Sequence, residues 1–271
     1  MNAEYTVFID ESFFKWFGLP VKESNICYGA LSLPKSRLKN LERFEKSIRQ
    51  YAFDRLPASE QASHAGGELK YTAFRHFTPT VIDELGGKLD YFLSKNGAAI
   101  FGFFIPAEGL FNYHLRSDYI DDAKALRTLP EVDYKKRISE IRDGMLKKWE
   151  DAEHNLGLLE ELYPTFFNFV VQYHGHYLKK PFQIVYDSRH PEEDAELHKC
   201  AEDFARQADR ATPGAFSHYR GYSTASSANS AGLRLVDWIA GEVRSFFYHN
   251  PVVVGGDSNP LLLQISGLAS C

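Results

Sequence analysis

Apolar residues recur at two different spacings along the chain, and these spacings predict both strands and helices. Short runs of apolar and β-branched residues are typical of strands, and they occur at Tyr5–Ile9, Asn25–Leu33, Ala98–Ile105 and Phe182–Tyr186. Apolar residues three or four positions apart are typical of amphipathic helices, and they occur over about Ser36–Phe53, Ile82–Phe92, Leu159–Tyr177, Leu197–Ala208 and Leu233–Phe247. Because strands and helices alternate, we expect an α/β sheet flanked by helices.

The stretches between these elements are more polar. We interpret Asp54–Gly67 and Ala211–Ser230 as loops, because both are rich in small and turn-forming residues. Residues 107–153 carry many charges and predict a polar, partly helical insertion, and we assign no structure to the tail at 249–271. The length is compatible with a single domain over residues 1–271 that contains this insertion.

The composition is that of a globular protein. Of the 271 residues, 44% are hydrophobic, which is enough for a substantial core. No apolar run is long enough to span a membrane, the N-terminus lacks a signal-peptide pattern, and the three cysteines have no metal-binding spacing. We therefore expect a cytoplasmic protein. A net charge of −5 argues against coating nucleic acid through bulk positive charge, but it is compatible with a local binding patch.

Two aspartates follow predicted strands. Asp10 comes directly after Tyr5–Ile9, and Asp187 comes directly after Phe182–Tyr186. Ligands of α/β sheets bind beyond the carboxyl ends of the strands, which makes both residues candidates for a functional site. An aspartate at such a position is also a common turn residue, so either residue taken alone is weak support for a function.

A third aspartate, Asp237, lies within an apolar helical stripe. Burying a carboxylate there costs several kcal/mol unless a cation compensates its charge. The cation is either a metal ion or a basic side chain such as that of Arg234, three residues earlier. Gly241, one turn later, would leave room for a ligand beside the carboxylate.

The remaining candidates carry weaker signals. Glu68 and Lys70 follow the predicted loop Asp54–Gly67, where they could belong to a site or to a solvated edge. His174 and His176 resemble a metal-binding pair, but residues two apart on a helix do not face each other, so a structural role is favoured. Three residues before the last helix either pack together or stack on a nucleic-acid base, namely His218, Tyr219 and Tyr222.

Four segments match one ordered set of motifs: Tyr5-Thr-Val-Phe-Ile-Asp-Glu-Ser12, Glu68-Leu-Lys70, Ile184-Val-Tyr-Asp187 and Gly232-Leu-Arg-Leu-Val-Asp-Trp-Ile-Ala-Gly241. Through them, the chain resembles an uncharacterised prokaryotic family known as domain of unknown function 3800. The resemblance implies an RNase H-like mixed central sheet flanked by helices. It also implies four acidic site positions, Asp10, Glu68, Asp187 and Asp237, and makes Glu11 either an additional metal ligand or a cap. Phe13 follows the Asp-Glu-Ser motif, where the family usually has glycine.

The function that this resemblance implies is metal-dependent phosphodiester hydrolysis by a nuclease. Mg²⁺ and Mn²⁺ prefer carboxylate ligands, and two such ions can activate water and stabilise the leaving oxygen. We expect three cations near the phosphate groups of a nucleic acid or nucleotide, namely Lys70, Arg234 and Arg244. Two other functions stay open: a non-catalytic RNase H-like binding module in a defence or toxin system, and a hydrolase of small nucleotides.

A single site requires that the fold bring the acids together. We expect Asp10 and Asp187 on adjacent strands, with Asp237 facing them from the last helix. A structure with Asp10 and Asp237 on opposite faces would rule this site out.

Overall fold

The computed structural model describes part of the chain in detail. The described residues are 3–13, 25–64, 69–106, 130, 132–133, 136, 140, 170, 174, 178–188, 191–211, 214, 216–249 and 262–263. Most of the predicted insertion at 107–153, of the predicted helix Leu159–Tyr177 and of the tail lies outside these residues. Within the described part, no helix is both long and apolar enough to cross a membrane.

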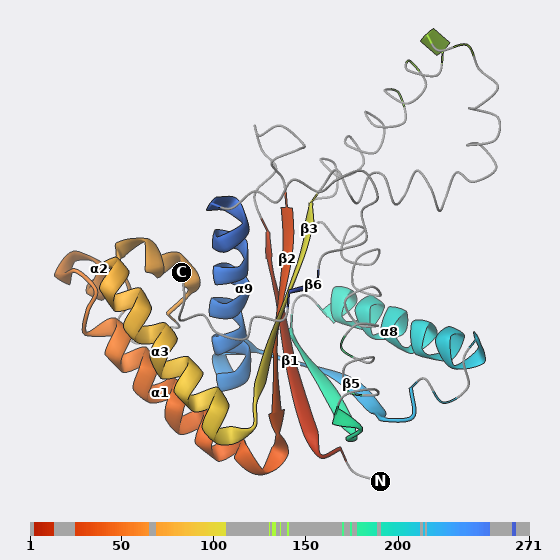
Figure 1. Cartoon of the computed structure of the whole chain (residues 1–271), viewed down its shortest axis with the longest axis horizontal. Coiled ribbons are helices and arrows are strands. Elements are labelled where there is room, and N and C mark those ends of the chain that lie inside the picture. The colour runs from red at the N-terminus through yellow and green to blue at the C-terminus, as the bar shows by residue number, and fades with distance from the viewer. Residues whose placement is uncertain are drawn as a thin grey trace.

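The described strands form one mixed sheet (Figure 1). They are β1 Tyr5–Phe13, β2 Asn25–Pro34, β3 Ala99–Pro106, β4 Phe182–Asp187, β5 Tyr219–Ala225 and the short β6 Leu262–Leu263. Their order across the sheet is β5-β4-β1-β2-β3-β6. β1, β2 and β3 form an antiparallel meander, whereas β4 runs parallel to β1 and β5 runs parallel to β4. The predicted α/β sheet is therefore confirmed.

Helices cover both faces of this sheet (Figure 1). The α-helices are α1 Leu38–Phe53, α2 Ala58–His64, α3 Pro79–Asn96, α8 Pro191–Ala211 and α9 Ala231–His249, and short 3₁₀ turns are η2 Lys35–Arg37, η3 Tyr71–His76 and η5 Ser227–Asn229. α9 lies directly on one face and is covered in turn by α1 and α3, while α8 lies on the opposite face. The helix that carries Asp237 is thus enclosed between the sheet and an outer helical layer.

α9 approaches the sheet unusually closely at two glycines. A Cβ atom at Gly29 of β2 would lie 2.7 Å from the backbone nitrogen of Ala240, and a Cβ atom at Gly232 would lie 2.4 Å from the ring of Phe8 in β1. At distances this short, a side chain at either position would force the opposite element to shift. Because the two contacts lie eight residues apart along α9, they fix the helix against both β1 and β2.

The first strand is longer than its apolar pattern predicts. β1 continues past Asp10 to Phe13, because β2 stays paired with it as far as Ile26. β4, on the other side of β1, ends at Asp187. The prediction that the first strand ends before Asp10 is therefore wrong, and Asp10 lies within β1 at the height where β4 ends.

Two stretches interpreted as loops contain regular structure. In Asp54–Gly67, helix α2 begins after Pro57, whose carbonyl accepts the N–H groups of Glu60 and Gln61; its Ala, Glu and Gln residues are good helix formers. In Ala211–Ser230, strand β5 pairs with β4. None of its residues is fully buried. The strand therefore has no buried face that would require alternating apolar and polar residues, and its sequence does not mark it as a strand.

His174 lies buried on the sheet face opposite α9. Its Nε2 atom is 3.0 Å from the hydroxyl of Ser32, and its ring stacks on that of Phe182 with 4.3 Å between centroids. Burial, aided by the nearby His218, lowers the pKa of His174 to about 4. His174 therefore has the structural role that its sequence context favours, whereas His176 lies outside the described residues.

Protonation of His174 should destabilise the fold in mild acid. Its pKa is about 4 in the folded protein and 6.5 ordinarily, so the unfolded state binds more protons between these pH values. The free energy of unfolding should therefore fall as the pH decreases from 6.5 to 4. His174→Gln should remove on the order of 2–3 kcal/mol of this pH-dependent loss, measured by urea denaturation across the range. His198→Gln, at a half-exposed position on α8, is the control; equal slopes in both variants would contradict the assignment.

Candidate functional site

Asp10 and Asp187 occupy matching positions on neighbouring parallel strands. β1 and β4 are paired in register up to the residue before each aspartate. Phe8 and Val185, two residues earlier, both belong to the core beneath α9. Because side chains alternate between the faces of a strand, both aspartates belong to the α9 face. Their predicted location on adjacent strands is confirmed, and Asp10 is only 7% exposed.

Asp187 is oriented by the turn that precedes α9. The backbone N–H of Ser227 donates a hydrogen bond to Oδ1 of Asp187, at 2.9 Å. Ser227 is the first residue of η5 and is buried. The side chain of Ser226 accepts the N–H of Ala228 and stabilises the same turn, at 3.3 Å. The orientation of the Asp187 carboxylate therefore depends on the position of η5.

Asp237 is bound to the segment that follows Glu68. The backbone N–H of Tyr71 donates to Oδ2 of Asp237 at 2.9 Å, and the indole N–H of Trp238 donates to the carbonyl of Leu69 at 2.6 Å. Two consecutive residues of α9 thus hold residues 69–71 from two directions. Because α9 covers the face that includes Asp10, Asp10 and Asp237 lie on the same side of the sheet.

The space beside Gly241 is filled by Tyr71. A Cβ atom at Gly241 would lie 2.1 Å from the Tyr71 ring, so the expectation of room for a ligand there is wrong. The Tyr71 side chain also hydrogen-bonds Glu242. Burial raises the pKa of the Glu242 carboxyl, and this hydrogen bond partly opposes the rise. Tyr71 therefore contacts α9 at three positions, Asp237, Gly241 and Glu242, which span about one and a half helical turns. Sequence spacing alone does not reveal these contacts.

The described acids are chemically suited to a hard cation, but they do not form a complete metal site by themselves. Within the described part of the chain, no group of three or more His, Cys, Asp and Glu side chains is arranged to hold a metal ion. Carboxylate oxygens suit Mg²⁺ or Mn²⁺, and each carboxylate offers about four lone-pair sites. The hydrogen bonds that the backbone amides of Ser227 and Tyr71 donate to Asp187 and Asp237 are therefore compatible with metal ligation by the same carboxylates.

Several predicted site residues are described in part or not at all. Glu68 lies outside the described residues. Glu11 lies on β1 opposite Tyr28, and Arg244 lies on α9, but their side chains are outside the described part. Lys70 is half-buried and lies between the two residues that α9 holds in place.

Arg234 has a structural environment. Its Nε and Nη2 atoms each donate to one oxygen of Glu45 in α1, both at 2.9 Å. Its Nη1 atom donates to the carbonyl oxygens of Ser227 and Ala228, also at 2.9 Å. Four of the five guanidinium N–H groups are used in this way, which favours a structural role for Arg234 over the predicted phosphate contact.

The aromatic residues of β5 lie away from the acids. The ring of Tyr222 stacks on Tyr186 of β4 and on His198 of α8. Tyr219 packs against Phe182, which alternation along β4 places on the same face as Tyr186. Of the two alternatives that the sequence leaves open for Tyr219 and Tyr222, the structure shows packing, because both rings lie beneath α8.

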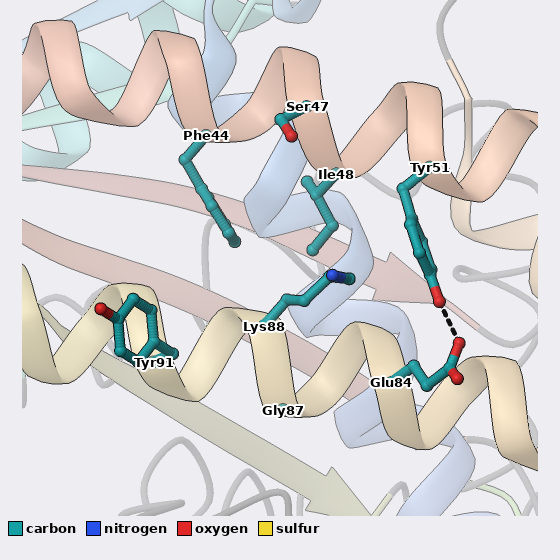
Figure 2. A pocket seen from close by; sticks show the side chains of 8 residues that line it. All are labelled: Phe44, Ser47, Ile48, Tyr51, Glu84, Gly87, Lys88 and Tyr91. Carbon is teal, nitrogen blue, oxygen red and sulfur yellow. Dashed lines mark hydrogen bonds between the residues drawn. The ribbon is translucent and has the colours of Figure 1, made fainter.

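A pocket of about 520 Å³ lies between α1 and α3 (Figure 2). The hydroxyl of Tyr51 donates to Glu84, and the ammonium of Lys88 lies 4.4 Å from the centroid of the Tyr51 ring. Glu84 is the only acid among the lining residues, so this pocket offers no pair of carboxylates. It is distinct from the group of acids on the sheet.

No family model matches the chain, and no curated protein matches it. The resemblance to domain of unknown function 3800 therefore rests on the four motifs alone.

Glycine at position 241 should stabilise the fold, whereas a second helical glycine should not. In Gly241→Ala the new methyl group would collide with the Tyr71 ring, and we expect a loss of about 1–3 kcal/mol in the free energy of unfolding. Gly87 in α3 is the control, because nothing lies within 4 Å of a Cβ atom there. Gly87→Ala should be neutral or stabilising by about 1 kcal/mol. Urea denaturation measures both, and equal effects would contradict the packing of Tyr71 on α9.

Proposed function

We propose that the chain hydrolyses phosphodiester bonds of nucleic acid with divalent metal ions, as an RNase H-like nuclease. One observation carries the proposal: Asp10 and Asp187 lie on neighbouring strands, on the face that is covered by the helix of Asp237. Three acids from distant parts of the chain therefore share one side of the sheet. An antiparallel meander continued by two parallel strands is also compatible with an RNase H-like core.

Oxygen donors on this face would hold Mg²⁺ or Mn²⁺. The principal ligands in this proposal are Asp10, Glu68, Asp187 and Asp237. The bound ions would polarise the phosphate and lower the pKa of water, which carboxylates alone cannot do. The task of the protein is to hold the carboxylates in place, and the amides of Ser227 and Tyr71 provide this for two of them.

Two cations remain candidates for phosphate binding. Lys70 immediately precedes Tyr71, whose amide is bound to Asp237. Arg244 comes seven residues, or about two helical turns, after Asp237 on α9. The backbone of Lys70 therefore adjoins a residue that is bound to Asp237. The backbone of Arg244 lies on the same side of α9 as Asp237. A cation near the acids would attract the phosphate groups that the carboxylates repel.

Divalent metal should stabilise the folded protein and support cleavage. A ligand at about 100 times its dissociation constant adds roughly 2.7 kcal/mol, so we expect Mn²⁺ to raise the melting temperature by roughly 5 °C relative to EDTA. Asp10→Asn and Asp187→Asn should reduce this gain and abolish metal-dependent cleavage of labelled DNA or RNA.

The control for these variants is Asp90→Asn, at a half-buried position of α3, which should behave as wild type. A wild-type protein that Mn²⁺ neither stabilises nor activates on any DNA or RNA substrate would contradict the proposal. A non-catalytic binding module would then be the better interpretation.

Asp237→Asn should separate catalysis from stability. The Asn side chain can still accept the Tyr71 amide, and the loss of one negative charge relieves repulsion between acids. In EDTA, we therefore expect the variant to be at least as stable as wild type, while its cleavage rate in saturating Mn²⁺ falls by about two orders of magnitude or more. Thermal melts and cleavage rates measure the two effects. A less stable variant with the wild-type rate per folded molecule would contradict the ligand role of Asp237.

A further inference from the structure

A buried carboxylate outside the group of acids is connected to it through hydrogen bonds. Glu45 of α1 is 3% exposed, and both of its oxygens accept hydrogen bonds from the guanidinium of Arg234 in α9. The two bonds are each 2.9 Å long and form a fork, the geometry in which arginine and carboxylate pair most strongly. The pair therefore joins α1 to α9 at a fixed orientation of the guanidinium.

The same guanidinium holds the turn η5. Its Nη1 atom donates to the carbonyl oxygens of Ser227 and Ala228, each at 2.9 Å. Ser227 in turn donates its N–H to Oδ1 of Asp187, also at 2.9 Å. A continuous series of hydrogen bonds thus runs from Glu45 through Arg234 and Ser227 to Asp187.

We propose that Glu45 is a positioning residue for Asp187. It fixes the Arg234 guanidinium, which fixes η5, and the Ser227 amide then holds the Asp187 carboxylate in the orientation needed for metal ligation. This inference rests on the proposed function, because it takes Asp187 as a metal ligand. Glu45 itself contacts neither metal nor substrate in this role.

The geometry of arginine makes the connection directional. The guanidinium is planar and its N–H groups point in fixed directions, so Nη1 reaches both carbonyls of η5 while Nε and Nη2 face Glu45. The Arg234 side chain is 17% exposed, which limits competition from water. Loss of the Glu45 charge would leave a largely buried cation uncompensated and allow the guanidinium to turn away from η5.

Arg49 provides a matched control on the same helix. Its Nε atom also donates to Glu45, at 2.9 Å, from one turn further along α1. Arg49→Gln removes a partner of Glu45 but keeps both the Arg234 fork and the contact with η5. Ile48→Val, at a position that is 2% exposed, is a second control that reduces the stability of α1 packing without altering any hydrogen bond of the series.

The test compares Glu45→Gln and Arg234→Lys with these two controls in the full chain. Hydrogen exchange of the Ser227 and Ala228 amides reports the turn, and the Mn²⁺ concentration that gives half of the rise in melting temperature reports the metal site. In both test variants we expect amide exchange about ten-fold faster and a half-saturating Mn²⁺ concentration roughly ten-fold higher. The kcat for cleavage should fall while KM for the oligonucleotide stays unchanged, and the double variant should be no worse than the more affected single variant.

The outcomes separate this inference from the proposed function. Faster exchange and weaker Mn²⁺ response in the test variants, with wild-type values in both controls, would support the positioning role. Exchange or Mn²⁺ response equal to that of the controls would overturn it, even if Glu45→Gln lowers stability. A wild-type protein without any Mn²⁺ response would instead overturn the proposed function, and with it the role of Asp187 as a ligand, whatever the exchange rates of η5.

Discussion

The close contact between α9 and the sheet is the constraint on which the candidate site depends. Gly29 and Gly232 bring helix and strands so near that a single added carbon atom would collide with the opposite element. In a core packed at this density, the helix cannot lift or slide without opening voids. The height of Asp237 above the sheet is therefore set by the close contacts of α9 with β1 and β2. Such rigidity is what a catalytic or metal-binding group requires of its scaffold.

The elements of the core can be predicted from the sequence because their apolar residues follow one period throughout. The strands that become β2 and β4 and the helices that become α1 and α9 all have this property. Asp237 is also recognisable, because a carboxylate interrupts an apolar stripe. Asp10 and Asp187 each follow an apolar run, and the parallel pairing of β1 with β4 brings them to one height.

The rest depends on partners that are far away in the chain. Glu45 interrupts the apolar stripe of α1 as Asp237 interrupts that of α9, but only the fold reveals that its partner is Arg234, 189 positions later. The missing side chain of Gly241 looks like space for a ligand until Tyr71 is seen to fill it. β5 has no apolar alternation that would mark it as a strand in the sequence. Its pairing with β4 and its packing under α8 define it instead.

The attachment of residues 69–71 to α9 fixes the point at which this segment joins the core. The Trp238 indole and the Asp237 carboxylate hold the backbone of Leu69 and Tyr71, so a change in the length of residues 65–67 need not be transmitted beyond position 69. Insertions or deletions before position 69 should therefore leave the bond between the Tyr71 amide and Asp237 unchanged. An anchor of this kind insulates the packing of α9 from changes in the chain that leads up to it.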